Sequence, residues 1–214
     1  MHFEDLLQQV RRLPLFSTDL LLSGSVSPEK LHKQLTLWKA AGKVIQLRRG
    51  LYTLAEPYRQ IAPHSFTVAN RLVSPSYVSL QSALAHHGLI PESVLQVTSI
   101  TSRQRTTSIE TPLGTYLFRH IQPKLFHGFQ LFNITTDQKA YIARPEKALL
   151  DLIYLTPKGD QVAFIDSLRL QNMEGLNTDW LIQSARDSEI KKLVRGAEAL
   201  ISSIDTSNIK TYEI

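Results

Sequence analysis

The first pattern along the chain is helical. Four apolar side chains recur at positions i, i+3, i+4 and i+7 and predict the buried stripe of an amphipathic helix: Phe3, Leu6, Leu7 and Val10. The helix is expected to end near Leu13-Pro14, because the residue before a proline is driven out of the helical region. Ser17 is the expected N-cap of a short second helix over 18–23, and Gly24-Ser25-Val26 predicts a tight turn after it.

A third helix has the clearest boundaries. Ser27-Pro28 supplies a capping hydroxyl followed by proline at the first helical position, and Gly42 supplies a stop at the other end. Three side chains fall on one side of this helix and are expected to face the core: Leu31, Leu35 and Trp38.

A β-hairpin is predicted directly after this helix. Strand-forming residues occupy 44–47 and 51–54, and Arg49-Gly50 between them predicts a turn. Helix, helix, turn, capped helix and hairpin, in this order, predict a winged helix-turn-helix domain within residues 1–55. In such a domain the first turns of one helix present side chains to the major groove of DNA, and the hairpin meets phosphates or the minor groove.

Nine side chains of this segment are candidates for contact with DNA. They lie at the start, on the outer face or on the flanks of the third helix, or at the hairpin tip: Ser27, Glu29, Lys30, His32, Lys33, Thr36, Lys39, Arg48 and Arg49. Trp38 and Tyr52 are interpreted as core residues rather than as platforms for stacked bases. A winged helix that grips protein instead of nucleic acid remains the alternative.

Positive charge is concentrated in the same segment. The first 54 of the 214 residues hold eight Lys or Arg against four Asp or Glu, a balance of +4 in a chain whose formal net charge is +5. No acidic residue lies between Lys30 and Ala55, whereas six basic residues do. This uneven charge favours binding of a polyanion, although a solvated basic face gives the same pattern.

Residues 64–214 are expected to form a larger α+β domain after a proline-bounded linker over 55–64. Strand-like segments predict a mixed or antiparallel sheet: 96–101, 106–111, 116–121, 129–134 and 139–143. Helices that back the sheet are predicted at 66–72, 80–87 and 144–154. The last third is expected to be helical, over 161–170, 178–184 and 190–204.

Sequence motifs for catalysis are sparse. The chain has no P-loop, no glycine-rich dinucleotide turn and no His-Glu-x-x-His, and it has no cysteine for a disulfide or a thiolate metal site. His86-His87 point about 100° apart on a helix and make a poor metal pair. Glu146 is interpreted as complementing a helix dipole, and Lys147 with Asp151 as an ordinary i,i+4 ion pair. We expect a non-enzymatic protein without cofactor or metal, with a nucleotide-acting enzyme as the less favoured alternative.

The composition is that of a globular protein outside the membrane. No apolar run approaches the roughly 20 residues that cross a bilayer, and the start, Met1-His2-Phe3-Glu4-Asp5, lacks the basic and apolar parts of a signal peptide. The lack of cysteine suits a reducing compartment. We therefore expect a cytoplasmic location, no membrane partner, and a monomer or weak dimer.

Several stretches, in their order and spacing, carry a resemblance to a known family. They are 47–52 (Leu-Arg-Arg-Gly-Leu-Tyr), 75–84, 87–92, 98–101 and 143–151, with Ser-Tyr-Val-Ser, Gly-Leu-Ile-Pro-Glu and Pro-Glu-Lys-Ala as the most specific combination. In these stretches the chain resembles the AbiEi antitoxins, transcriptional regulators of bacterial type IV (abortive-infection) toxin–antitoxin systems. The resemblance covers roughly residues 10–155, and the helical last third departs from it most.

The resemblance implies a function. Such proteins are encoded beside a nucleotidyltransferase-like toxin, repress the shared promoter through the N-terminal winged helix, and counteract the toxin through the C-terminal domain. It therefore implies double-stranded promoter DNA as a partner, and functional antagonism of such a toxin without a stable complex. A stand-alone regulator without a toxin is the alternative. No catalytic residue is carried over by the resemblance.

Overall fold

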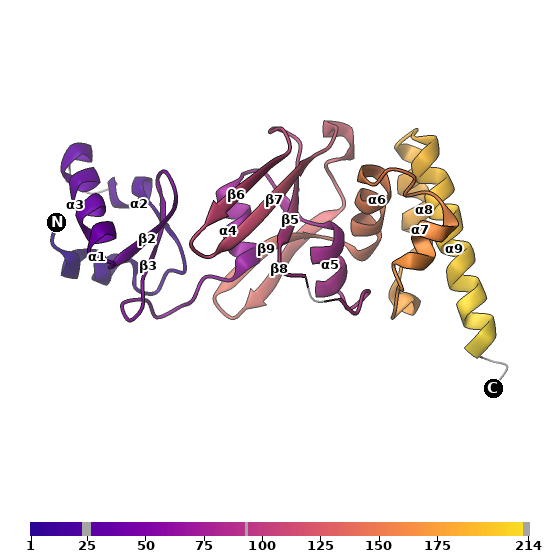
Figure 1. The fold of residues 1–214 in the computed structure, drawn as a ribbon, viewed down its shortest axis with the longest axis horizontal. Coiled ribbons are helices and arrows are strands. Elements are labelled where there is room, and N and C mark those ends of the chain that lie inside the picture. Colours follow the sequence, from indigo (N-terminus) through magenta and orange to yellow (C-terminus); the bar gives the residue numbers. More distant parts are fainter. Residues whose placement is uncertain (23–26, 93, 212–214) are drawn as a thin grey trace.

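The computed structural model describes residues 1–22, 27–92 and 94–211. Within these ranges, nine α-helices and two β-sheets make an α+β fold, which confirms the expected fold class. The parts follow one another along a single long axis, with the N-terminal segment at one end and the last helices at the other (Figure 1). In the same ranges, no helix combines the length and the apolar character needed to cross a membrane.

Three helices and a small sheet form the N-terminal segment. Their order along the chain is α1 (Phe3–Val10), β1 (Phe16–Ser17), α2 (Thr18–Leu22), α3 (Pro28–Ala40), β2 (Val44–Arg48) and β3 (Leu51–Leu54). The three predicted helices and the hairpin are confirmed. Strand β1 was not predicted, and it pairs antiparallel with β3 on the side away from β2. The turn predicted at 24–26 lies outside the described residues.

One hydrophobic cluster holds this segment together. Its buried members come from all three helices and all three strands: Phe3, Leu6, Val10, Phe16, Leu21, Leu31, Leu35, Val44, Tyr52 and Leu54. Trp38 packs at its edge, with its ring centroid 5.5 Å from that of Phe3. Both predicted ends of α3 are confirmed, because Ser27 Oγ accepts a hydrogen bond from the Lys30 amide and Gly42 adopts a φ of 67°.

A mixed six-stranded sheet forms the middle of the molecule, in the order β6-β7-β5-β4-β9-β8. Its strands are β4 (Tyr77–Val78), β5 (Val97–Thr101), β6 (Thr107–Thr111), β7 (Gly114–His120), β8 (Phe129–Thr135) and β9 (Gln138–Ala143). Strand β4 runs parallel to β9 and β5 runs parallel to β7, whereas the other neighbours are antiparallel. The five predicted strands are confirmed, and the short β4 was not predicted as a strand.

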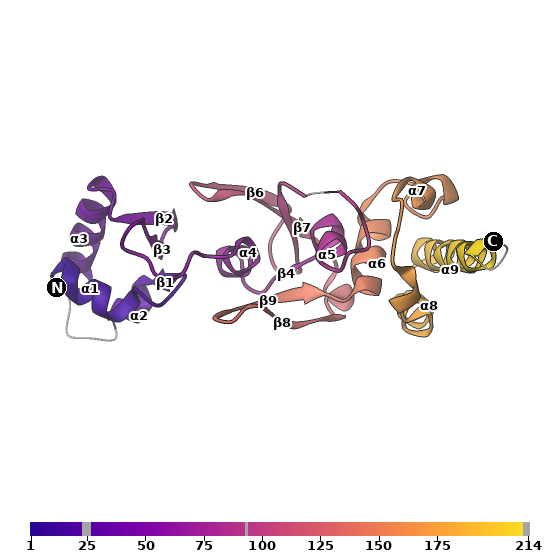
Figure 2. The same ribbon diagram turned by 90° about the horizontal axis from the view of Figure 1, so that it is seen from below.

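Helices lie beside the sheet and continue to the far end of the molecule (Figure 2). They are α4 (Ser65–Leu72), α5 (Leu80–His86), α6 (Pro145–Leu155), α7 (Val162–Ser167), α8 (Thr178–Asp187) and α9 (Lys191–Thr211), with short 3-10 helices at Pro123–Leu125 and Met173–Gly175. Helix α6 contacts α5 near the sheet and α8 and α9 beyond it. Helix α7 ends before the predicted residue 170, because Arg169 has a φ of 47° and leaves the helical path.

The junction between the N-terminal segment and the sheet is held on both sides. The Gln60 amide donates a hydrogen bond to the Arg11 carbonyl of the N-terminal segment (3.1 Å). On the other side, the Gln138 side chain of β9 donates to the Ala62 carbonyl (2.9 Å) and accepts from the His64 amide (2.8 Å). The stretch 55–64, predicted as a linker, contains no helix or strand and is anchored at several points.

The β2–β3 hairpin also contacts the rest of the molecule. Leu47 and Leu51 of the hairpin are buried in the large hydrophobic cluster that contains Val68 and Leu72 of α4. The N-terminal segment therefore contributes side chains to two clusters, its own and that of the body, residues 64–211. Burial of these leucines stabilises the contact between the two parts.

Three histidines lie near the start of the body. The His86 ring is 5.7 Å from the Phe66 ring, 5.8 Å from the Phe132 ring and 5.1 Å from the His87 ring. Burial lowers the pKa of His86, and the nearby His87 and His64 lower it further. Burial also lowers the pKa of His64. Both side chains therefore take up protons less readily in the folded chain than in the unfolded chain.

We expect the free energy of unfolding to fall as the solution is acidified through the ordinary histidine pKa of 6.5. The unfolded chain binds protons there while the folded chain does so only at lower pH, so this part of the stability is present above pH 6.5 and lost below it. Urea unfolding across this range measures the effect. In His86→Asn the dependence should weaken; an unchanged dependence in this variant would contradict this account.

Candidate nucleic-acid interface

A groove of about 270 Å³ lies between α3 and the β2–β3 hairpin. Side chains from both elements line it: His32, Leu35, Thr36, Lys39, Gln46, Arg49 and Tyr52. Leu35 and Tyr52 are buried and form its apolar floor. Four of the nine candidate DNA contacts, two basic and two able to hydrogen-bond to bases, are therefore brought together at one place.

Local sequence explains this placement. His32, Thr36 and Lys39 are spaced at i, i+4 and i+7, so they share one face of α3. In the hairpin, Arg48 pairs with Leu51, which leaves Arg49-Gly50 as a two-residue turn. Gly50 has a φ of 78°, a conformation that glycine adopts without strain. The turn therefore places Arg49 at the tip of the hairpin, facing the groove.

Hydrogen bonds cross the groove and fix the hairpin against α3. Lys39 Nζ donates to Gln46 Oε1 (2.9 Å), and Gln46 Nε2 donates to the Tyr52 hydroxyl (3.2 Å). The Tyr52 ring stacks on Phe16 at 5.8 Å, and burial raises the pKa of Tyr52, which keeps the phenol neutral. Sequence reasoning missed Gln46; the available signal was its position opposite Tyr52 in the hairpin register.

The groove lies in a region of uncompensated positive charge. Six basic side chains lie between residues 30 and 55: Lys30, Lys33, Lys39, Lys43, Arg48 and Arg49. Among the side chains that the structure describes, none of these six takes part in an ion pair. The local potential is therefore positive and attracts anions.

The two arginines expected together at the hairpin tip point in different directions. Arg49 lines the groove, but Arg48 Nη2 donates a hydrogen bond to the Arg71 carbonyl of α4 (3.2 Å). Both arginines were predicted to contact DNA from the hairpin tip; the structure places Arg49 at the groove and turns the Arg48 guanidinium toward the body. The direction of Arg48 depends on how the hairpin sits against α4, which no local pattern encodes.

The other candidates lie on α3 outside the groove. Glu29, Lys30 and Lys33 are exposed on the first turns of the helix. Ser27 caps the helix, and its hydroxyl oxygen is engaged with the Lys30 amide. Three exposed charged side chains therefore surround the start of α3 without contributing to the groove wall.

A second polar group is buried inside the body. The Asp151 side chain, 2% exposed, accepts hydrogen bonds from Lys147 Nζ (2.6 Å), the Tyr77 hydroxyl (2.9 Å) and the Ser79 hydroxyl (2.8 Å). The predicted i,i+4 ion pair between Lys147 and Asp151 is present. It is buried rather than exposed on a helix surface, because neighbouring elements cover α6. Burial, together with Asp151, raises the pKa of Tyr77, which keeps its hydroxyl protonated as a donor.

Glu146 lies in the first turn of α6, as predicted, and has a further partner. It is buried, and its Oε1 accepts a hydrogen bond from the Asn177 amide (2.7 Å). Asn177 is the N-cap of α8, where its side chain accepts from the Trp180 amide (2.9 Å). Glu146 therefore fixes the start of α8 against α6, in addition to lying in the first turn of its own helix.

Within the described residues, no group of three or more His, Asp or Glu side chains is placed to hold a metal ion. The groove beside α3 thus combines basic charge with exposed hydrogen-bonding side chains, whereas the buried Asp151 group is closed to solvent. Compared with known proteins, the chain matches no protein-family model and no curated protein.

Proposed function

We propose that residues 1–55 form a winged helix-turn-helix that binds double-stranded promoter DNA, and that the chain is a bacterial transcriptional repressor of the AbiEi antitoxin kind. One observation carries the proposal: His32, Thr36 and Lys39 of α3 share a groove with Arg49 of the hairpin, in a region whose basic charges are unpaired among the described residues. Lys39 and Arg49 suit phosphates, whereas His32 and Thr36 suit base edges.

The position of α3 supports this proposal. The helix lies at the end of the molecule farthest from α9, with charged side chains exposed on its first turns (Figure 1). An α-helix with its side chains is about 10–12 Å across, close to the width of the major groove of B-DNA, about 12 Å. Helix α3 therefore fits the major groove while Arg49 reaches the adjoining backbone.

The second part of the proposal is that the body opposes a nucleotidyltransferase-like toxin without forming a stable complex with it. The resemblance to the AbiEi antitoxins supports this part. Two of the stretches that carry the resemblance, 75–84 and 143–151, meet in the structure at the buried Asp151 group. The stretches are therefore joined in space as well as ordered along the chain.

We expect Arg49→Ala to weaken binding about equally on promoter and random duplexes, because a contact with phosphate carries no sequence information. The slope of log affinity against log salt should fall by about 0.9 for one lost phosphate contact. Arg48→Ala is the matched control, since the Arg48 guanidinium is turned toward Arg71, and its slope should stay near that of the wild type. Fluorescence anisotropy at several salt concentrations measures both; equal slopes for the wild type and Arg49→Ala would contradict the proposed interface.

In cells, the Arg49→Ala variant separates repression from antitoxin activity. Arg49→Ala should derepress a reporter placed behind the chain's own promoter. Expressed from an unrelated promoter, it should still relieve growth arrest by the nucleotidyltransferase-like toxin, because the β2–β3 hairpin that carries Arg49 is separated from α7, α8 and α9 by the six-stranded sheet. Loss of rescue together with repression would contradict a separate antitoxin activity in the body. If the wild type also fails to relieve the growth arrest, the antitoxin part of the proposal is wrong and the alternative of a stand-alone regulator remains.

A further inference from the structure

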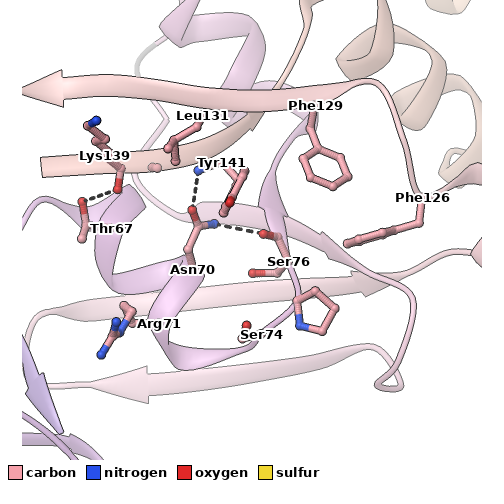
Figure 3. Close-up of a pocket in the computed structure, with 12 residues that line it drawn as sticks. Thr67, Asn70, Arg71, Ser74, Ser76, Phe126, Phe129, Leu131, Lys139 and Tyr141 are labelled. Carbon is pink, nitrogen blue, oxygen red and sulfur yellow. Dashed lines mark hydrogen bonds between the residues drawn. The ribbon is translucent and has the colours of Figure 1, made fainter. Parts of the chain in front are cut away.

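A larger cavity lies in the body, away from the groove. It has a volume of about 640 Å³ and opens between α4 and the β8–β9 hairpin (Figure 3). Small-molecule sites typically measure about 300–1,000 Å³. None of the nine candidate DNA contacts lines this cavity, so it needs a separate explanation.

One end of the cavity is aromatic. The Phe126 and Phe129 rings lie there with centroids 5.1 Å apart (Figure 3). The buried Tyr77 ring stacks on Phe129 at 4.4 Å. Tyr141 and Leu131 pair across β9 and β8 and remain 45% and 50% exposed. Packed rings and exposed apolar side chains at one place form a surface on which a flat ring can stack.

The other end of the cavity is cationic. On the side opposite the two phenylalanines, Lys139 lies at the β9 wall and Arg71 at the α4 wall, with their charged ends turned apart (Figure 3). No acidic side chain is among the described residues that line the cavity, and neither cation takes part in an ion pair between described side chains. Two unneutralised cations at one end favour an anionic group, and Arg suits phosphate in particular.

The wall between the two ends is polar and held in place. Asn70 Oδ1 accepts a hydrogen bond from the Tyr141 amide (2.6 Å), and Thr67 Oγ1 donates to the Lys139 carbonyl (3.4 Å). These bonds attach α4 to β9 and fix the wall of the cavity. Ser74 also lines the cavity and is exposed there. The exposed Ser74 hydroxyl is a group to which a sugar hydroxyl can hydrogen-bond.

We infer that this cavity binds a nucleoside monophosphate, with the base against Phe126, Phe129 and Tyr141 and the phosphate at the end that carries Arg71 and Lys139. A simple aromatic acid would leave the polar middle unused, and inorganic phosphate would leave the aromatic end unused. The inference is independent of the proposed DNA binding, because the two sites share no lining residue.

Isothermal titration calorimetry of the full chain tests this inference. The ligands are inorganic phosphate, adenosine, the monophosphates of adenosine, guanosine, cytidine and uridine, and a short oligoadenylate with a terminal phosphate. At least one monophosphate should bind with one equivalent per chain. Adenosine and phosphate alone should bind at least about tenfold more weakly, since each loses either charge-assisted hydrogen bonds or stacking. Tighter binding of the oligoadenylate would support the same chemistry with a strand end as its source.

Single substitutions test which end of the cavity binds the phosphate and which end binds the base. Arg71→Ala and Lys139→Ala should each weaken monophosphate binding about tenfold or more, because each removes a charge-assisted hydrogen bond to the phosphate. Adenosine has no phosphate, so its binding should be unaffected. Both variants keep the backbone carbonyls that accept hydrogen bonds from Arg48 and Thr67, so the wall of the cavity should stay in place. Tyr141→Ala should weaken adenosine and monophosphate alike. Arg103→Ala, an exposed arginine that does not line the cavity, is the matched control. Absence of binding by all four monophosphates to the folded chain, or binding that survives both cation variants, overturns the inference.

Discussion

Asp151→Ala is expected to lower the free energy of unfolding by about 3–5 kcal/mol, because it leaves the Lys147 ammonium buried without its counter-charge. The Lys147 side chain is 4% exposed, so little solvent reaches its ammonium to replace the lost carboxylate. The same change also leaves the hydroxyls of Tyr77 and Ser79 without their acceptor. Urea unfolding followed by circular dichroism measures the loss.

Two comparisons make this result specific to the buried pair. Glu92→Ala removes one partner of an exposed pair, in which Glu92 lies 3.8 Å from Arg169, and should cost at most about 1 kcal/mol. The double change Lys147→Met with Asp151→Leu removes both charges and should recover part of the loss. An Asp151→Ala chain as stable as Glu92→Ala would show that the pair is hydrated in solution.

Leu51→Ala is expected to cost about 2–5 kcal/mol, the range for a fully buried leucine. Leu51 is 2% exposed, and its side chain belongs to the cluster of the body although its strand belongs to the N-terminal segment. Its loss should therefore weaken the contact between the two parts as well as the hairpin itself. The matched control is Leu37→Ala on α3, where the leucine is 67% exposed and the change should lie within about 0.5 kcal/mol of zero.

The two tryptophans report on the two parts separately. Trp38 packs on the N-terminal cluster and Trp180 on that of the body. In chains that keep only one of them, with phenylalanine at the other position, the urea transitions should coincide if the parts unfold together. Leu51→Ala should move the Trp38 transition to lower urea than the Trp180 transition. If Leu51→Ala instead behaves like Leu37→Ala, the two parts are energetically independent.

The sequence predicts most elements because their boundary signals are local. Ser27-Pro28 and Gly42 bound α3, and both signals act within one helical turn. Asp151 shows where such reasoning ends: its partners Tyr77 and Ser79 lie 74 and 72 residues away along the chain. Spacing identified the ion pair, but burial depends on how α6 packs against α5, α8 and α9. The burial of such a pair depends on the packing of elements that are distant along the chain, and local sequence patterns do not predict that packing.

The groove was predictable in part for the same reason. Helical spacing alone places His32, Thr36 and Lys39 on one face, and the two-residue turn alone places Arg49 at the tip. The direction of Arg48 could not be predicted, because it depends on the contact between hairpin and α4.

The separation of the two ends of the molecule has a thermodynamic consequence. Helix α3 lies at one end, and α7, α8 and α9 lie at the other, with the sheet between them (Figure 2). A duplex along α3 would cover no surface at the opposite end, so a macromolecule that meets the last helices would not compete with DNA for space. Unless the anchored junction changes shape, the two binding free energies should simply add. Occupancy of the operator would then be insensitive to the amount of that second macromolecule.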